Sequence, residues 1–240
     1  APLAPLSTPA GRYRAVFFDA DDTLFAYPAA ERCALLACRE KFRIAAEPET
    51  FIAAYRRHNH DVWREFERGE IDQALLRVER FRRLAAELGI GLRLEEVSAF
   101  YLEALSSQSQ LLPGALELAR ELAAAFPLAL VTNGIASVQK RRFAASPILP
   151  YFQAVVISEE VGIAKPDPRI FAPALEAIGV SARDVLYVGD SVTSDMAAAR
   201  NAGMDFCWLN PQGAAVPEGY APAYVIASLH EFPEILKSEQ

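Results

Sequence analysis

Short strand-like segments alternate with amphipathic, helix-like segments through the second half of the chain, and this alternation constrains the fold more than any other feature. Strands in strict turn with helices indicate a parallel sheet with right-handed crossover connections. The early segment "RYRAVFFD" joins the same set, because it is continuously apolar, as expected of a strand buried on both faces. The other strand-like segments are "PLALVTNG", "AVVISEE", "DVLYVGD" and "FCWLN". The pattern predicts an α/β fold built on a parallel sheet.

A helical block interrupts this alternation between residues 28 and 110. Its segment "IDQALLRVERFRRLAAELG" places apolar side chains in steps of three and four residues, and Gly89 supplies a helix stop. The expected apolar stripe consists of Ile71, Leu75, Val78, Phe81, Ala85 and Leu88. Because the block contains no strand-like segment, we expect a helical domain inserted into one α/β domain. The expected boundaries are residues 13–27 and 111–240 for the core, 28–110 for the insertion and 1–12 for a loosely ordered extension.

The composition is that of an ordinary globular protein, with 52% hydrophobic and 23% charged residues. The formal net charge of -7 argues against general binding to nucleic acids or anionic membranes. No apolar run is long enough to span a bilayer, and the opening "APLAPLSTPAGR" lacks the features of a secretory signal, so a cytoplasmic location is the default expectation. Three cysteines at irregular spacing argue against a disulfide framework, and we expect Cys33, Cys38 and Cys207 to be small buried side chains.

Acidic residues gather where two of the expected strands end. Asp19 and Asp21 follow the first strand; if the chain stays extended there, their side chains project to the same side and that of Asp22 points elsewhere. Asp190 follows another strand, and Asp195 lies in the first turn of the next helix. Carboxylates that converge at this edge of a parallel sheet favour a hard cation, and Mg2+ fits best if a phosphate completes its ligands. Asp22 and Asp195 could instead only cap a helix or shape a turn.

Groups suited to hold a phosphate follow the neighbouring strands. "VTNG" puts Thr132, Asn133 and Gly134 at a strand end, where backbone N–H groups can face an anion, although Asn-Gly is also common in ordinary turns. In "GIAKPDP", Pro166 restricts Lys165 to an extended backbone. A single lysine among loop acids is a fixed positive charge that can neutralise both a nucleophile and a phosphate. The alternative is an exposed surface lysine.

Four segments carry a family resemblance: "FFDADDTLF", "VTNG", "GIAKPDP" and "VGDSVTSD" closely resemble, in this order, the four motifs of the haloacid dehalogenase superfamily. The match spans the whole α/β portion of the chain. The resemblance implies a Rossmann-like core with a helical cap domain inserted after the first motif, which agrees with the helical block at 28–110.

The resemblance also implies roles for the matching residues. Asp19 would be the nucleophile and form an aspartyl-phosphate. Asp21 would be the general acid for the leaving group and then the general base for water. Thr132, Asn133 and Lys165 would hold the phosphoryl group. This chemistry is consistent, because a carboxylate beside a dianionic phosphate is a poor nucleophile unless a metal and a cation cancel the repulsion.

The implied cofactor is Mg2+. Its ligands would be the carboxylates of Asp19 and Asp190 and the backbone carbonyl of Asp21. Asp195 would hold these ligands in place without binding the ion itself. The implied enzyme is a phosphoric monoester hydrolase.

A narrower resemblance concerns the pyrimidine 5′-nucleotidase branch, which removes phosphate from nucleoside monophosphates. It rests on "FFDADDTLF", "VISEEVGIAKPDPRIF", "CWLN" and "PEGYAPAYVIASLHEFPEIL". Members of that branch more often carry Glu where this chain has Asp22. The resemblance implies a small phosphorylated metabolite, a nucleoside monophosphate, as the partner, and it leaves both a monomer and a homodimer open.

Alternatives to this function remain open. A sugar-phosphate or phosphoglycolate phosphatase, or a phosphomutase, would keep every core residue and differ in the cap. A catalytically silent binding module is less compatible with the sequence, because every expected chemical residue is present. A dehalogenase is disfavoured, because those relatives lack the second acid of the first motif and this chain has Asp21.

Overall fold

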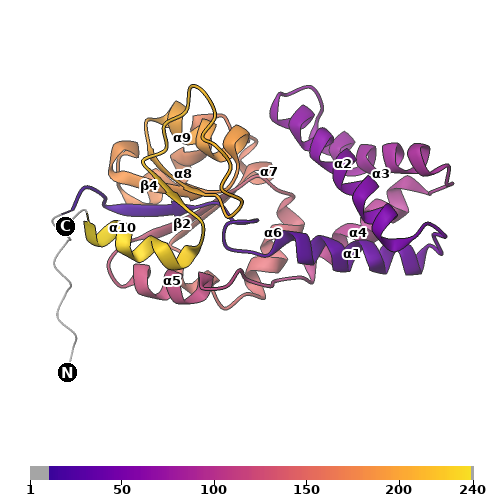
Figure 1. Ribbon diagram of the computed structural model, residues 1–240, viewed down its shortest axis with the longest axis horizontal. Helices are drawn as coiled ribbons and strands as arrows, with labels where there is room; N and C mark the ends of the chain where they lie inside the picture. The colour runs from indigo at the N-terminus through magenta and orange to yellow at the C-terminus, as the bar shows by residue number, and fades with distance from the viewer. Residues whose placement is uncertain (1–10, 239–240) are drawn as a thin grey trace. The chain divides into compact units, whose positions relative to one another are not determined.

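Six parallel strands form one sheet in the order β3-β2-β1-β4-β5-β6 in the structure, a computed structural model that describes residues 11–238 (Figure 1). The strands are β1 (Ala15–Phe18), β2 (Leu128–Thr132), β3 (Ala154–Ile157), β4 (Val185–Gly189), β5 (Asp205–Leu209) and β6 (Tyr224–Ile226). Every neighbouring pair runs parallel. The predicted α/β fold with a parallel sheet is therefore confirmed. Residues 1–10 of the expected N-terminal extension lie outside the described residues.

Two apolar layers cover the faces of the sheet, because successive strand residues point to opposite sides. Phe18 of β1 packs in one layer with the helices α5 and α10, and Phe17 packs in the other with α8 and α9 (Figure 1). These helices are α5 (Ala115–Ala123), α8 (Ala172–Ile178), α9 (Ala197–Ala202) and α10 (Phe232–Ser238). All residues of β1, β2 and β4 are buried, as expected of strands covered on both faces.

The strand order reverses next to β1. The chain runs outward from β1 through β2 to β3 on one side, and from β4 through β5 to β6 on the other. Crevices for ligands form beyond the carboxyl ends of the strands at such a reversal. The fold therefore places the residues that follow β1 and β4 next to one another at a favourable position for a site.

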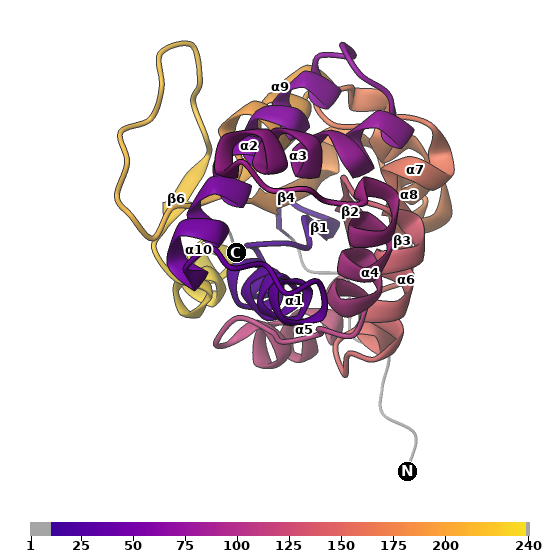
Figure 2. The same ribbon diagram turned by 90° about the vertical axis from the view of Figure 1, so that its right-hand side faces the viewer.

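A second compact unit consists of helices. It comprises Tyr27–Ser109 and Ser137–Arg142, and the first unit holds the described residues up to Ala26, Gln110–Ala136 and those from Phe143 onward. The helices of the second unit are α1 (Tyr27–Lys41), α2 (Pro48–Glu67), α3 (Gln73–Leu88), α4 (Leu94–Ser106) and most of α6 (Ala136–Ala144). Within this unit α2 lies beside α3, and α1 beside α4 (Figure 2). The predicted helical character of residues 28–110 is confirmed.

The ends of α3 follow from local sequence signals. The Asp72 side chain accepts a hydrogen bond from the backbone N–H of Leu75 at 2.8 Å and so caps the first turn. Gly89 ends the helix with a left-handed backbone, φ 63°, which a residue without a Cβ adopts readily. The helix stop predicted at Gly89 is confirmed.

The buried face of α3 differs from the predicted stripe. Leu75 is 43% exposed, whereas the charged Arg80 is only 1% exposed. The Arg80 guanidinium lies 5.0 Å from the ring centroid of Tyr101 and 5.9 Å from that of Tyr55, and it donates to Asn59 Oδ1 at 3.0 Å. Cation–π attraction to these rings compensates part of the desolvation of the guanidinium, so a cation occupies a position that an apolar residue would otherwise fill.

Three smaller expectations need correction. The residues "SEE" after β3 form the short helix α7 (Ser158–Val161) instead of continuing the strand, and "YVI" forms the sixth strand, which the sequence pattern did not predict. Both are too short to show a period. Cys33 is exposed on α1, while Cys38 and Cys207 are buried as expected. Among the described residues, no helix has both the length and the apolar character needed to cross a membrane.

Glu79 generates a testable prediction for the helical unit. Hydrogen bonds from Arg82, which outweigh the opposing effect of burial, together with those from Arg83 lower its pKa to about 2. A carboxyl group whose pKa is lowered by folding stabilises the fold above its unfolded pKa, which is 4.5 for Glu, and loses that contribution as pH falls toward 2. We expect Glu79→Gln to lower the free energy of unfolding by about 1 kcal/mol at pH 7, and this difference to shrink between pH 4.5 and 2.

Chemical denaturation of both proteins across this pH range measures the effect. The matched control is Glu96→Gln, which removes an exposed pair with Arg93 and should change the unfolding free energy little at any pH. A Glu79→Gln difference that stays constant down to pH 2 would contradict the assignment.

Candidate active site

Three buried or half-buried carboxylates meet at the carboxyl edge of the sheet. Asp19 follows β1, Asp190 follows β4, and Asp195 comes from the turn after β4. One carboxylate oxygen from each lies within 4.8 Å of the others. The structure thus brings together the acids that the sequence placed after two different strands, because β1 and β4 are direct neighbours in the sheet.

Asp195 lies in a π-helical turn (Val192–Met196) that leads into α9. Ser191 caps this turn, because its side chain accepts a hydrogen bond from the Ser194 N–H at 3.2 Å. Asp195 instead accepts from the Ser191 N–H through Oδ2 at 3.1 Å and from Lys165 through Oδ1. The alternative that Asp195 serves only as a helix cap is therefore wrong.

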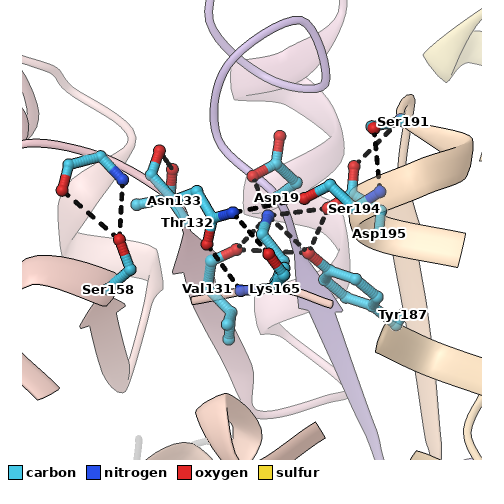
Figure 3. A network of polar contacts seen from close by, with 11 residues as sticks. Asp19, Val131, Thr132, Asn133, Ser158, Lys165, Tyr187, Ser191, Ser194 and Asp195 are labelled. Carbon is cyan, nitrogen blue, oxygen red and sulfur yellow. Dashed lines mark hydrogen bonds and ion pairs between the residues drawn. The ribbon is translucent and has the colours of Figure 1, made fainter. Parts of the chain in front are cut away.

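Lys165 joins two of the three carboxylates. Its Nζ lies 2.6 Å from Asp19 Oδ1 and 2.7 Å from Asp195 Oδ1 (Figure 3). The side chain is 2% exposed, so the alternative of a surface lysine is wrong. Burial alone would lower the pKa of Lys165, but the charges of Asp19 and Asp195 outweigh burial and raise it. The ammonium is a permanent positive charge in this site.

The Asn133 side chain grips the backbone of Lys165. Its Oδ1 accepts from the Lys165 N–H at 2.8 Å, and its Nδ2 donates to the Lys165 carbonyl at 3.0 Å (Figure 3). Two hydrogen bonds from one rigid carboxamide fix the loop that carries the lysine. The Gly134 N–H, in turn, donates to Ser158 Oγ at 3.1 Å. The Asn133 side chain and the Gly134 N–H, both suggested by the sequence for anion binding, therefore form hydrogen bonds within the chain. The third suggested residue, Thr132, has its side chain buried at the end of β2.

The loop after Asp19 turns sharply. The N–H groups of Leu24 and Phe25 both donate to the Ala20 carbonyl at 2.9 Å, and the Asp22 N–H donates to the Phe25 carbonyl at 2.9 Å. Asp22 has a left-handed φ of 61°, so its backbone shapes this turn, in line with one of the two expectations for it. Asp21 is half-buried, and its carboxylate is not one of the three that converge.

The charges of this cluster do not balance within the core. The cluster holds three carboxylates, and the one ammonium of Lys165 contacts two of them, Asp19 and Asp195. Burial and the charge of Asp195 raise the pKa of Asp19 to about 8, which Lys165 only partly offsets. Burial and the charges of Asp195 and Asp19 also raise the pKa of Asp190 well above its usual range. Among the described residues, no hydrogen-bond donor reaches the Asp190 carboxylate. Excess negative charge and desolvated oxygen ligands fit a divalent cation.

Two residues that the sequence pattern missed support this geometry. Trp208 of β5 donates its Nε1–H to the Asp190 carbonyl at 2.8 Å, and it lies opposite Gly189 in the strand register. Gly189 has no side chain where Asp195 approaches: a Cβ there would lie 2.5 Å from Asp195 Oδ2. No local sequence signal identifies such contacts, because they depend on which strands become neighbours.

Comparison with known proteins places the chain in a family. Residues 13–203 match the family of haloacid dehalogenase-like hydrolases. The chain belongs to this family, and the resemblance predicted from the four motifs is confirmed. The chain is 33% identical over 222 residues to pyrimidine 5′-nucleotidase YjjG of Escherichia coli (strain K12). This match covers 92% of the chain and 96% of the relative.

Two further relatives agree. The chain is 32% identical over 229 residues to pyrimidine 5′-nucleotidase PynA of Streptococcus pneumoniae (strain ATCC BAA-255 / R6), over 93% of this chain and 95% of the relative. Its fold matches the crystal structure of the putative HAD-hydrolase YfnB from Bacillus subtilis bound to magnesium with a TM-score of 0.88, at 34% identity over 94% of this chain and 99% of that one. The narrower resemblance to the pyrimidine 5′-nucleotidase branch is thus also confirmed.

Gly189 provides a test of the carboxylate cluster. An added methyl group in Gly189→Ala would lie 2.5 Å from Asp195 Oδ2 and displace the Asp195 carboxylate from its place in the cluster. We expect the affinity of the cluster for a divalent cation, measured by titration calorimetry, to fall about tenfold or more. The control is Gly91→Ala, since nothing lies within 4 Å of a Cβ there. A wild-type affinity for the cation in Gly189→Ala would contradict the packing described for Asp195.

The Asn133 carboxamide provides a second test. In Asn133→Asp the shape is kept, but a carboxylate oxygen replaces the Nδ2 donor and faces the Lys165 carbonyl, which repels it. We expect the lysine loop to shift and hydrolytic turnover (kcat) to fall about tenfold or more.

Asn201→Asp is the matched control, because the exposed Asn201 donates to the adjacent Pro166 carbonyl at 3.2 Å but does not hold the lysine. Its kcat should stay close to that of the wild type. Equal losses in both variants would show that a negative charge near this loop, and not the grip on Lys165, is responsible.

Proposed function

We propose that the chain is a Mg2+-dependent phosphomonoesterase that acts on nucleoside monophosphates with a pyrimidine base. The observation that carries this proposal is the position of Lys165, whose buried ammonium contacts Asp19 at 2.6 Å inside a cluster of carboxylates. A fixed cation beside one carboxylate suits the attack of that carboxylate on an anionic substrate, because it offsets the repulsion between the two.

Asp19 acts as the nucleophile in this proposal. Its carboxylate attacks the phosphorus atom, the bond to the ester oxygen breaks, and an aspartyl-phosphate forms. Lys165 stabilises the charge on the phosphoryl group together with the hydroxyl of Thr132 at the end of β2. Asn133 contributes through Lys165, whose backbone it holds at 2.8 and 3.0 Å.

Asp21 acts as the acid and base. Its carboxyl group gives a proton to the leaving oxygen, so that the alcohol departs neutral, and the resulting carboxylate then takes a proton from the attacking water. The water oxygen bonds to phosphorus, the bond between phosphorus and the Asp19 oxygen breaks, and inorganic phosphate leaves with Asp19 restored. One side chain two residues from the nucleophile can serve both steps.

The fit of the cluster to a divalent cation supports Mg2+ as the cofactor. Asp19, the backbone carbonyl of Asp21 and Asp190 would hold it, and Asp195 would support them. When bound, the ion supplies positive charge that neutralises the substrate phosphate.

Similarity to the two pyrimidine 5′-nucleotidases supports the nucleotide specificity. We propose that the helical unit of α1–α4 is the cap domain that selects the substrate. A cytoplasmic location is supported by the free state of all three cysteines.

Release of inorganic phosphate tests the function. We expect Mg2+-dependent turnover of pyrimidine nucleoside monophosphates, weaker turnover of sugar phosphates and phosphoglycolate, and loss of activity with a chelator. Asp19→Asn should lower kcat by about a thousandfold or more, because it removes the nucleophile. Asp61→Asn, the same change on the exposed surface of α2, is the control.

The outcomes separate the parts of the proposal. Strong sugar-phosphate turnover with no response to nucleotides would refute the nucleotidase and leave the phosphatase. Near-normal activity of Asp19→Asn would remove the assigned nucleophile. Transfer of phosphate to a second sugar phosphate in place of water would indicate a phosphomutase.

A further inference from the structure

Tyr187 reaches the centre of the site from inside the sheet. It belongs to β4, is fully buried, and carries its hydroxyl to within 3.1 Å of Lys165 Nζ and 2.8 Å of Asp195 Oδ1 (Figure 3). The hydroxyl also lies 3.3 Å from the Val131 carbonyl. Among the described residues, no other uncharged side chain forms a hydrogen bond with the Lys165 ammonium.

Two aromatic rings pack against the Tyr187 ring. The centroid of the Tyr187 ring lies 4.9 Å from that of Phe171, in an edge-on arrangement, and 5.8 Å from that of Phe206. A ring packed in this way has little freedom to rotate or shift, so its hydroxyl is a fixed point. A polar atom that is held rigidly can orient a flexible side chain beside it, such as that of Lys165.

The hydrogen bonds around Lys165 show what this hydroxyl does. An ammonium has three N–H donors, and four acceptors surround it: Asp19 Oδ1, Asp195 Oδ1, the Val131 carbonyl and the Tyr187 hydroxyl. The tyrosine can accept from the ammonium and donate its own proton to Asp195. It therefore links the cation and the carboxylate in one chain of hydrogen bonds.

We propose that Tyr187 is a positioning residue for hydrolysis: its hydroxyl holds Lys165 Nζ and Asp195 Oδ1 so that the ammonium keeps its contact with Asp19. A lysine side chain is a flexible stem of four carbons with rotatable bonds, so it has no preferred direction of its own. Here Asn133 fixes its backbone end and Tyr187 fixes its ammonium end. The proposal rests on the proposed function, in which Asp19 is the nucleophile and Lys165 its cation.

Tyr187→Phe tests the proposal because it removes one oxygen atom and keeps the packed ring. The ammonium is then held only by the remaining acceptors, and we expect its position relative to Asp19 to become less well defined. We expect kcat for a nucleoside monophosphate to fall about tenfold, with KM changed less than about twofold, because the phosphate still meets the same positive charge.

The matched control is Tyr13→Phe. Tyr13 is 2% exposed, and its hydroxyl donates to Asp205 at 2.6 Å, where β5 begins, at the opposite edge of the sheet from the site. The two variants lose the same atom from a buried, hydrogen-bonded position. If Tyr187 has only a structural role, both variants should lower stability and neither should change kcat. If Tyr187 positions Lys165, only Tyr187→Phe should lose kcat.

A rescue variant separates the hydrogen bond from the packing. In Tyr187→4-aminophenylalanine the ring carries an amino group that can donate and accept at the same place, and we expect it to recover most of the lost kcat. Failure to recover kcat, or a wild-type kcat in Tyr187→Phe, would overturn the proposal.

A crystal structure of Tyr187→Phe gives a readout that is independent of activity. We expect the Lys165 Nζ to move away from Asp19 or to adopt more than one position. An unchanged contact at 2.6 Å would overturn the proposal even if kcat fell. If the wild-type protein hydrolyses no phosphomonoester, the proposed function fails, and this structure still decides whether the hydroxyl orients the lysine.

Discussion

The α/β core depends on the ion pairs that the buried ammonium of Lys165 forms with two carboxylates. This ammonium lies 2.6 Å from Asp19 and 2.7 Å from Asp195, in surroundings where like charges repel strongly because water is excluded. Without this cation, three carboxylates could not share one end of the sheet. The lysine offsets only part of their charge, and the remainder gives the site its capacity for a divalent cation.

Backbone geometry makes this concentration of charge possible. The reversal of strand order beside β1 places Asp19 next to Asp190, and Gly189 leaves the space into which the Asp195 carboxylate fits. Side chains that take no part in the chemistry then fix the charged groups: Asn133 holds the lysine backbone, and Trp208 holds the Asp190 carbonyl. The hydrolase site therefore draws on residues of β1, β2, β4 and β5 and the loops after them, and on the loop after α7 that carries Lys165.

Sequence reasoning succeeded where the signal is local. The alternation of strands and helices, the helix stop at Gly89 and the acids after β1 and β4 each follow from a few adjacent residues. It failed where the outcome depended on packing. The three residues of β6 are too few to show a period, and Arg80 is buried while Leu75 is exposed, because the rings of Tyr101 and Tyr55 accept a cation that the apolar pattern of α3 did not reveal.

By itself, the sequence determined the class of fold, the family and the set of acids around the site, because hydrophobic period and the order of short motifs are written into neighbouring positions. Only the tertiary structure decided which of these side chains touch. Lys165 and Asp19 stand 146 positions apart along the chain, and their contact exists because parallel pairing of the strands brings their loops to one edge. The same pairing buries Tyr187 beneath them, in a strand whose sequence reads only as apolar core.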